Sequence, residues 1–176
     1  MQVVVINGRG GCGKDTFVEL CAKQVGKYMC FNVSTIDAVK NAARHCGWEG
    51  GKEDRDRKFL SDLKALMTEY NDYPHQSVLN HIKIFEGDLD RYDLNPDKAL
   101  VFIHCREPEA IERLKQELNA KTLLIRRPSL ESHDYGNSSD DGVDNYDYDY
   151  VVNNDGGLDA FGIAATNFLV ELGFNV

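Results

Sequence analysis

The chain has 176 residues, 42% of them hydrophobic and 28% charged, with a formal net charge of −9. This is an ordinary composition for a globular domain, and no stretch approaches the roughly 18 consecutive apolar residues of a membrane helix. The five cysteines are odd in number and scattered, which argues against a disulfide framework. With no basic leader at its start, the chain is predicted to be a single cytoplasmic domain over residues 1–176.

The negative charge is concentrated near the C-terminus. No Lys or Arg follows Arg127, so the first 127 residues carry a net charge of +1 and the remainder carries −10. An acidic segment of this kind repels a phosphate backbone, so duplex nucleic acid is a poor partner. Any phosphate site is expected within the first 127 residues.

Short apolar runs alternate with segments of helical periodicity along the chain. The runs predict strands at residues 2–6, 30–34, 99–103, 121–125 and 148–152. The periodic segments predict helices that end near residue 28, at 37–45, at 55–70, from 74 to about 89, at 108–118 and at 158–172. This alternation predicts an α/β fold with a parallel sheet of about five strands, covered by helices on both faces.

Two segments stand out from this pattern. The helix predicted at 55–70 carries one apolar stripe formed by Phe59, Leu63, Leu66 with Met67, and Tyr70. The stretch from Ser129 to Asn145 is polar, acidic and rich in Ser, Asn and Gly, and is expected to be a mobile loop.

The turn between the first strand and the first helix has the spacing Gly-x₄-Gly-Lys, which is the phosphate-loop pattern in its required strand–turn–helix context. Its residues are Gly8, Arg9, Gly10, Gly11, Cys12, Gly13, Lys14, Asp15 and Thr16. The glycines let several backbone N–H groups point at one anion, and the helix N-terminus and Lys14 add positive charge. We therefore expect ATP to bind through this loop.

The loop departs from the usual pattern directly after Lys14. The standard Ser or Thr, whose hydroxyl binds Mg²⁺, is replaced by Asp15, and the hydroxyl follows at Thr16. Asp15 either binds Mg²⁺, directly or through water, or caps the helix. Thr16 is expected to bond an α-phosphate.

The chain has no Asn-Lys-x-Asp guanine motif, and no Asp-x-x-Gly switch comes directly after the third predicted strand, which leaves a small kinase as the best interpretation of the loop. Further segments accompany the loop motif Gly13-Lys14-Asp15-Thr16: Asp37-Ala38-Val39-Lys40, Arg57 to Lys64, Cys105 to Glu109, Ile125-Arg126-Arg127 and Asn154-Asp155-Gly156. In these segments the chain resembles the deoxynucleoside monophosphate kinases of bacteriophages, within the nucleoside and nucleotide kinase group of P-loop proteins. P-loop phosphomevalonate kinases share some of these features, so the acceptor class stays open.

Residues about 37–92 are predicted to form an insertion that binds the acceptor. Lys40 and Arg44 lie four apart on one predicted helix and are assigned to the acceptor's phosphate, the alternative being solvated helix charge. Asp37 either accepts hydrogen bonds from a sugar or base, or caps the helix. Trp48 either stacks on a base of the acceptor or packs against other side chains of the protein.

Three arginines follow the third and fourth strands. Arg106, Arg126 and Arg127 are expected to neutralise charge during phosphoryl transfer. By the resemblance, the acidic loop at about 127–146 forms a short lid that carries arginines. The alternative is that Arg126 and Arg127 only end an edge strand.

The third strand lacks the acidic residue with which such kinases commonly order magnesium. It ends Ile103-His104-Cys105-Arg106, and the nearest acid is Glu107. Either Glu107 or Asp15 supplies the metal ligand, or metal handling is altered. Cys12 in the phosphate loop is expected to be a site of oxidation, because a helix N-terminus lowers the pKa of a thiol.

These features together predict transfer of the γ-phosphoryl group of ATP, with Mg²⁺, to a small phosphorylated acceptor. The preferred acceptor is a nucleoside or deoxynucleoside monophosphate. The alternatives are a kinase of another metabolite, such as phosphomevalonate, and a nucleotide-binding sensor that has lost turnover. The sequence leaves the oligomeric state open, a homodimer included.

Overall fold

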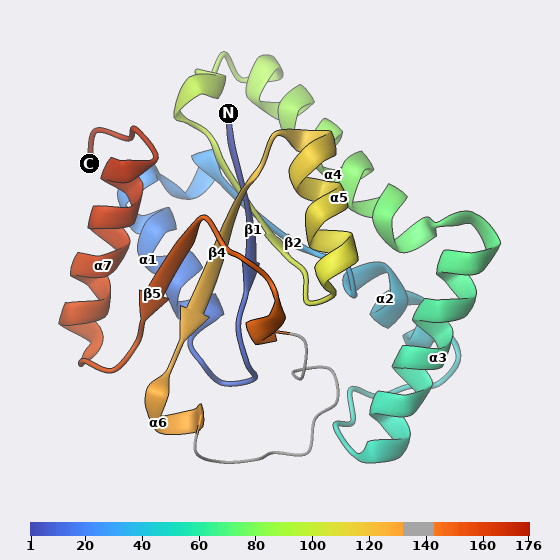
Figure 1. Ribbon diagram of the computed structural model, residues 1–176. Coiled ribbons are helices and arrows are strands. Elements are labelled where there is room, and N and C mark those ends of the chain that lie inside the picture. Colours follow the sequence, from blue (N-terminus) through green and yellow to red (C-terminus); the bar gives the residue numbers. More distant parts are fainter. Residues whose placement is uncertain (132–142) are drawn as a thin grey trace. The chain divides into compact units, whose positions relative to one another are not determined.

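The computed structural model describes residues 1–131 and 143–176 and is built around a five-stranded sheet (Figure 1). The strand order is β2-β3-β1-β4-β5. The strands are β1 (Gln2–Asn7), β2 (Cys30–Ser34), β3 (Leu100–His104), β4 (Lys121–Arg126) and β5 (Tyr150–Asn153). β1 pairs in parallel with both β3 and β4, and β4 pairs in parallel with β5, which confirms the predicted α/β fold.

Apart from α6, the helices fall at the positions that the periodicity predicts. They are α1 (Lys14–Val25), α2 (Asp37–His45), α3 (Asp54–Asn71), α4 (Tyr73–Arg91), α5 (Pro108–Leu118), α6 (Pro128–Glu131) and α7 (Leu158–Glu171). Short 3₁₀ turns lie at Lys27–Met29, Pro96–Lys98 and Val143–Asn145. Within the described ranges, no helix has both the length and the apolar character needed to cross a bilayer.

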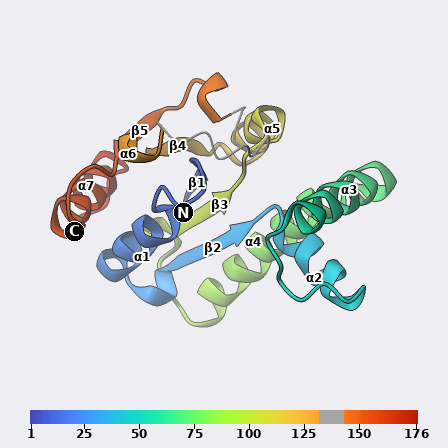
Figure 2. The same ribbon diagram turned by 90° about the horizontal axis from the view of Figure 1, so that it is seen from below.

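The chain divides into two compact units. The first consists of Met1–Asn32 and Leu89–Val176, and the second of Val33–Asp88. In the first unit, α1 and α7 lie side by side on one face of the sheet, and α5 packs on the other face against β1 and β4 (Figure 2).

The core of the first unit lies between the sheet and the pair α1 and α7. Alternate residues of β1, Val4 and Ile6, face this core, while Val3 and Val5 are buried on the opposite face. A strand buried on both faces reads as a continuous apolar run, as it does here. Phe17 of α1 fills the centre, with its ring 5.3 Å from that of Phe161.

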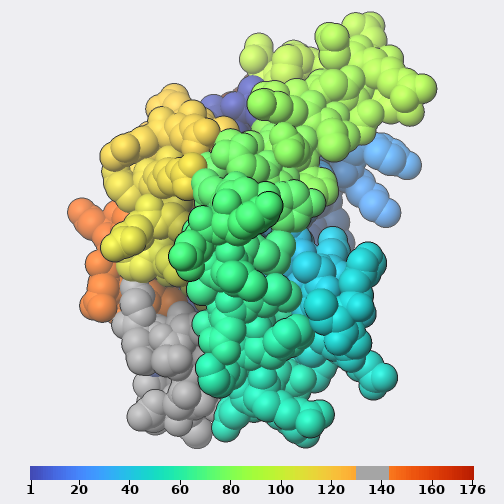
Figure 3. Space-filling model, turned by 90° about the vertical axis from the view of Figure 1, so that its right-hand side faces the viewer, coloured from blue at the N-terminus to red at the C-terminus, as the bar shows by residue number. Residues whose placement is uncertain are grey.

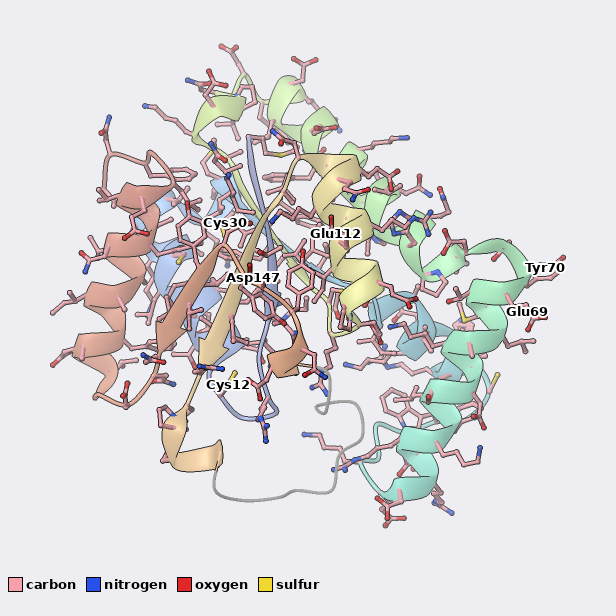
Figure 4. The ribbon with its side chains drawn as sticks, in the orientation of Figure 1. Cys12, Cys30, Glu69, Tyr70, Glu112 and Asp147 are labelled. Carbon is pink, nitrogen blue, oxygen red and sulfur yellow. The ribbon has the colours of Figure 1, made fainter. Side chains whose placement is uncertain are left out.

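The apolar stripe predicted on α3 is only partly correct. Its residues Leu63 and Met67 are partly buried, and Leu60 is partly buried with them. Leu66 and Tyr70 are 64% and 84% exposed; Figure 3 shows the surface of this helix, and Figure 4 labels Tyr70 on it. Apolar residues on α3 span a wider arc than one contact covers, and spacing alone does not tell which part is buried.

The C-terminal edge of the sheet also differs from expectation. β5 begins at Tyr150, because Asp149 is engaged through its side chain with the start of β4: its carboxylate accepts from Thr122 N at 2.8 Å. Within the predicted loop, Pro128–Glu131 is helical and Val143–Asn145 forms a 3₁₀ turn with Val143 buried. The rest of that loop, residues 132–142, lies outside the described residues.

The aromatic cluster under the sheet gives a direct test of the fold. Phe168 is 2% exposed, and its ring lies 5.5 Å from Phe17 and 5.3 Å from Tyr150. We expect Phe168→Ala to lower the free energy of unfolding by about 3–5 kcal/mol, because it leaves a cavity. Tyr28→Ala is the matched control: Tyr28 is 82% exposed, and its loss should cost under about 0.5 kcal/mol. Equal urea midpoints for the two variants would contradict this packing.

Candidate phosphate-binding site

The loop between β1 and α1 has a shape that only glycine permits at two positions. Gly8 has a φ of 147°, and a Cβ there would lie 2.5 Å from the carbonyl oxygen of Ile125. Gly13 has a φ of 102°, and a Cβ there would lie 2.6 Å from Asn154 Nδ2. Both positions are therefore closed to any L-residue with a side chain.

Two asparagines hold this loop in place. Asn7 is fully buried, and its Oδ1 accepts a hydrogen bond from Gly8 N at 2.7 Å while its Nδ2 donates to Tyr148 Oη at 2.7 Å. Asn154 donates from Nδ2 to the carbonyl oxygen of Cys12 at 2.8 Å. A buried amide whose hydrogen bonds are satisfied fixes the backbone that it contacts.

Sequence reasoning did not assign Asn7 or Tyr148 to the site. The available signal was a polar residue at the end of an apolar strand, which marks Asn7 as a residue in need of a partner. Its partner Tyr148 is 141 residues away, and no local pattern connects the two.

Lys14 directs its ammonium group into the loop. Its Nζ donates to the carbonyl oxygens of Gly8 and of Arg9, the latter at 3.0 Å. α1 begins at Lys14 with Gly13 as its N-cap, so the loop ends at a helix N-terminus. Glycine backbone, helix end and lysine thus meet in the arrangement that binds phosphate in P-loop proteins.

The predicted arginines also lie at this loop. Arg127 donates to the carbonyl oxygen of Gly11 at 3.5 Å, and Arg126 pairs with Asp144 at 3.1 Å. The backbone carbonyl of Arg106 accepts from Asn7 Nδ2 at 3.3 Å. Arg9, to which the sequence assigned no role, also pairs with Asp144, at 2.9 Å.

The two predicted metal ligands, Asp15 and Glu107, are both exposed. Asp15 lies in the first turn of α1 with its side chain 91% exposed, 4.0 Å from His104 Nε2. The N-cap of α1 is Gly13 rather than Asp15. Glu107 is exposed at the start of α5 and accepts from Cys105 Sγ at 3.7 Å.

Within the parts of the chain that are described, no three His, Cys, Asp or Glu side chains gather as a metal-binding group. Mg²⁺ usually needs only one or two protein carboxylates beside phosphate oxygens and water. An exposed carboxylate at Asp15, next to the phosphate loop, fits that requirement. Thr16, beside it, is exposed on α1.

Cys12 corrects the expectation of a reactive thiol. It is only 1% exposed, and burial raises the pKa of its thiol, although the charges of Lys14 and Arg106 act in the opposite direction. The helix N-terminus favours a thiolate, but desolvation of the buried sulfur outweighs it. Figure 4 shows Cys12 beside the end of β4.

The predicted acceptor residues lie in the second unit, on α2. Asp37 is the first residue of this helix, and its Oδ2 accepts from Ser34 N at 2.8 Å, while the N-cap is Ile36. Lys40 is half-buried. Arg44 is exposed and bonds Asn41 Oδ1 at 2.7 Å.

Arg44 also lies over the indole ring of Trp48, 5.8 Å from its centroid. The second unit holds a pocket of about 380 Å³ next to this pair, lined by Trp48, Lys52 and Arg55 among others. Neither Arg44 nor Lys40 lines this pocket. The two cations share one helix, but the pocket beside Trp48 does not bring them together.

No protein-family model matches the chain, and no curated protein matches it. Among solved structures, it is similar to shikimate kinase from Aquifex aeolicus, with 13% identity over 98% of this chain and 96% of that one, at a TM-score of 0.50. A putative kinase from Chloroflexus aurantiacus matches at 10% identity, covering 97% and 96%, with a TM-score of 0.48. Thymidylate kinase from Ehrlichia chaffeensis matches at 12%, covering 96% and 98%, with a TM-score of 0.44. The likeness to the shikimate kinase establishes the α/β fold.

The burial of Cys12 gives a test by alkylation. We expect Cys46, which is exposed, to react first with iodoacetamide at pH 7.5, and Cys12 and Cys21 to react only after unfolding. Burial raises the pKa of both buried thiols, so the reactive thiolate is scarce as well as inaccessible. Mass spectrometry of peptides over a time course measures the order. Labelling of Cys12 at the rate of Cys46 would show that the sulfur is open.

Proposed function

We propose that the chain is a P-loop phosphotransferase that moves the γ-phosphoryl group of ATP to a small phosphorylated acceptor, a nucleoside or deoxynucleoside monophosphate. The observation that carries this proposal is the loop from Gly8 to Lys14: its glycine-dependent backbone, the N-terminus of α1 and the Lys14 ammonium come together at the carboxyl end of β1. The fold shared with shikimate kinase is compatible with it.

The chemistry requires no nucleophilic side chain. The acceptor's phosphate oxygen attacks in line, so the protein's task is to position the two phosphates and stabilise the charge that spreads between them. Lys14 and the loop N–H groups bind the terminal phosphates, while Arg106, Arg126 and Arg127 offset the developing negative charge. Support for these arginines is their location at the loop, where Arg127 bonds Gly11.

Mg²⁺ supplies charge neutralisation at the β- and γ-phosphates when it is bound. Asp15 and Glu107 are the carboxylates that we propose to order its water shell. Asp15 is the stronger of the two, because its exposed side chain is one residue from Lys14.

The second unit is the proposed acceptor site. Lys40 and Arg44 provide two cations on one short helix, and Asp37 lies at its start. One oxygen of Asp37 is occupied by Ser34 N, so we assign this residue to holding the turn before α2, with only its second oxygen left for a substrate group.

A second candidate function is nucleotide sensing without turnover. The observation that favours it is His104 at the end of β3, where the side chain is 15% exposed and faces Asp15 at 4.0 Å. A histidine in this place contributes no carboxylate to a metal. Turnover that depends on an added acceptor separates the two functions.

The proposed activity is tested by ADP release from Mg-ATP with a panel of nucleoside and deoxynucleoside monophosphates, phosphomevalonate and a no-acceptor control. We expect release with one or a few monophosphates. Lys14→Ala should lower both ATP affinity and turnover at least 100-fold, since an N–H cradle remains without its full charge. Lys23→Ala, an exposed lysine in the last turn of the same helix, is the control and should leave both unchanged.

Tight ATP binding without ADP release from any acceptor of the panel would favour a nucleotide sensor over a kinase. Unchanged ATP binding in Lys14→Ala would overturn the assignment of the phosphate loop itself.

The acceptor site has its own prediction. We expect Lys40→Ala and Arg44→Ala each to raise the acceptor's KM about 10-fold with the KM for ATP unchanged, because a lost charge-assisted hydrogen bond to phosphate costs about 1.5 kcal/mol. Lys83→Ala removes an exposed lysine from α4 in the same unit and is the control. An equal rise in all three variants would show a general charge effect instead of a binding site.

A further inference from the structure

Asp144 joins two arginines at the mouth of the phosphate loop. Its Oδ2 accepts from Arg9 at 2.9 Å and its Oδ1 accepts from Arg126 at 3.1 Å. Arg9 belongs to the loop itself, and Arg126 is the last residue of β4. One carboxylate therefore links a residue of the loop to the strand beside it.

The environment of Asp144 favours its charged form. The hydrogen bond from Arg9 has the largest effect on the pKa of this carboxyl, and it exceeds the opposing effect of desolvation; together with the hydrogen bond from Arg126 it holds that pKa below its usual value. All three side chains are accessible: those of Arg9, Arg126 and Asp144 are 37%, 44% and 39% exposed. Ion pairs this exposed are weak and exchange partners readily.

Little room is left beside this carboxylate. A pocket lined by Arg9, Cys12, Arg126, Arg127 and Asp144 among others has a volume of about 10 Å³, which is about the space of one water molecule. A phosphate group does not fit there while the carboxylate stays between the two guanidinium groups.

Building on the proposed function, we propose that Arg9 and Arg126 form a phosphate-binding pair, and that Asp144 occupies its place until a triphosphate displaces it. A carboxylate presents two oxygens to two guanidinium groups, as a phosphate does, but carries less charge and fewer acceptor oxygens. Phosphate is therefore the stronger ligand for the same pair. The pair adds to the loop a binding residue, Arg9, that lies outside the glycine and lysine positions of the motif.

The competition is measured by calorimetric titration with inorganic tripolyphosphate and with ATP. Asp144→Asn removes the competing charge and should tighten binding of both about 3- to 10-fold, the range expected for release of two exposed ion pairs. Arg9→Gln removes one partner of the phosphate and should weaken binding by a similar factor.

Asp147→Asn is the matched control, because it makes the same charge change three residues further along. No hydrogen bond or ion pair joins Asp147, labelled in Figure 4, to another residue that the structure describes. It should change affinity less than about 2-fold, because an exposed charge that makes no direct contact is screened by salt. In the double variant Arg9→Gln with Asp144→Asn, the gain from the second substitution should shrink, since half of the pair is already gone.

Each outcome bears on the proposal. Equal effects of Asp144→Asn and Asp147→Asn, or weaker binding in Asp144→Asn, would overturn the competition while leaving the proposed function intact if Lys14→Ala still abolishes binding. Unchanged affinity in Arg9→Gln would remove Arg9 from the site. A wild-type protein that binds neither tripolyphosphate nor ATP would overturn both this inference and the proposed function.

Discussion

The close passage of the backbone at Gly8 past the carbonyl of Ile125 is the constraint on which the phosphate site depends. β4 pairs with β1 so that Asn7 lies opposite Leu124, and the loop then turns directly against the next residue of β4. A side chain at Gly8 would meet that carbonyl. The same pairing explains why Arg126 and Arg127 lie at the loop, because they follow Ile125 in the chain. Loop shape and arginine placement are therefore one consequence of a single strand register.

The order β1-β4-β5 brings the remaining supports to the same edge of the sheet. Parallel strands end together, so Asn154, just after β5, reaches the carbonyl of Cys12. Tyr148 precedes β5, and its side-chain hydroxyl accepts from Asn7 at the end of β1. Tyr148 also donates to the carbonyl of Val143. These partly buried bonds connect the loop to residues 143–154, and loss of the Tyr148 hydroxyl would leave the buried amide of Asn7 without that partner.

Sequence reasoning predicted what depends on local pattern and missed what depends on tertiary contact. The five strands, the helices other than α6 and the phosphate loop follow from apolar runs, periodicity and glycine spacing. The pairing of Asn7 with Tyr148 and that of Arg9 with Asp144 join residues 141 and 135 positions apart, so no local rule contains them. The pKa of the Cys12 thiol shows the same limit. Its position at a helix N-terminus predicts a low pKa, but burial raises the pKa, and burial is seen only in the packed structure. On α3, periodicity identified an apolar surface but not which part of it is covered.

The candidate phosphate site lies in a chain whose net charge is −9, so the position of the negative charge matters for anion binding. The cations at the loop all come from the first 127 residues, but the carboxylate that meets them, Asp144, comes from the acidic remainder. Ion pairs with basic residues neutralise part of the negative charge of that acidic remainder. Asp149 pairs with Lys115 at 2.9 Å, and although partial burial opposes it, this contact and those from Thr122 hold the pKa of Asp149 below its usual value. Unpaired surface acids beyond about 8–10 Å are screened at physiological salt. The charge that an approaching phosphate meets is therefore set by the few groups at the loop, and among these Asp144 is the acid whose carboxylate bridges two arginines beside the glycine backbone.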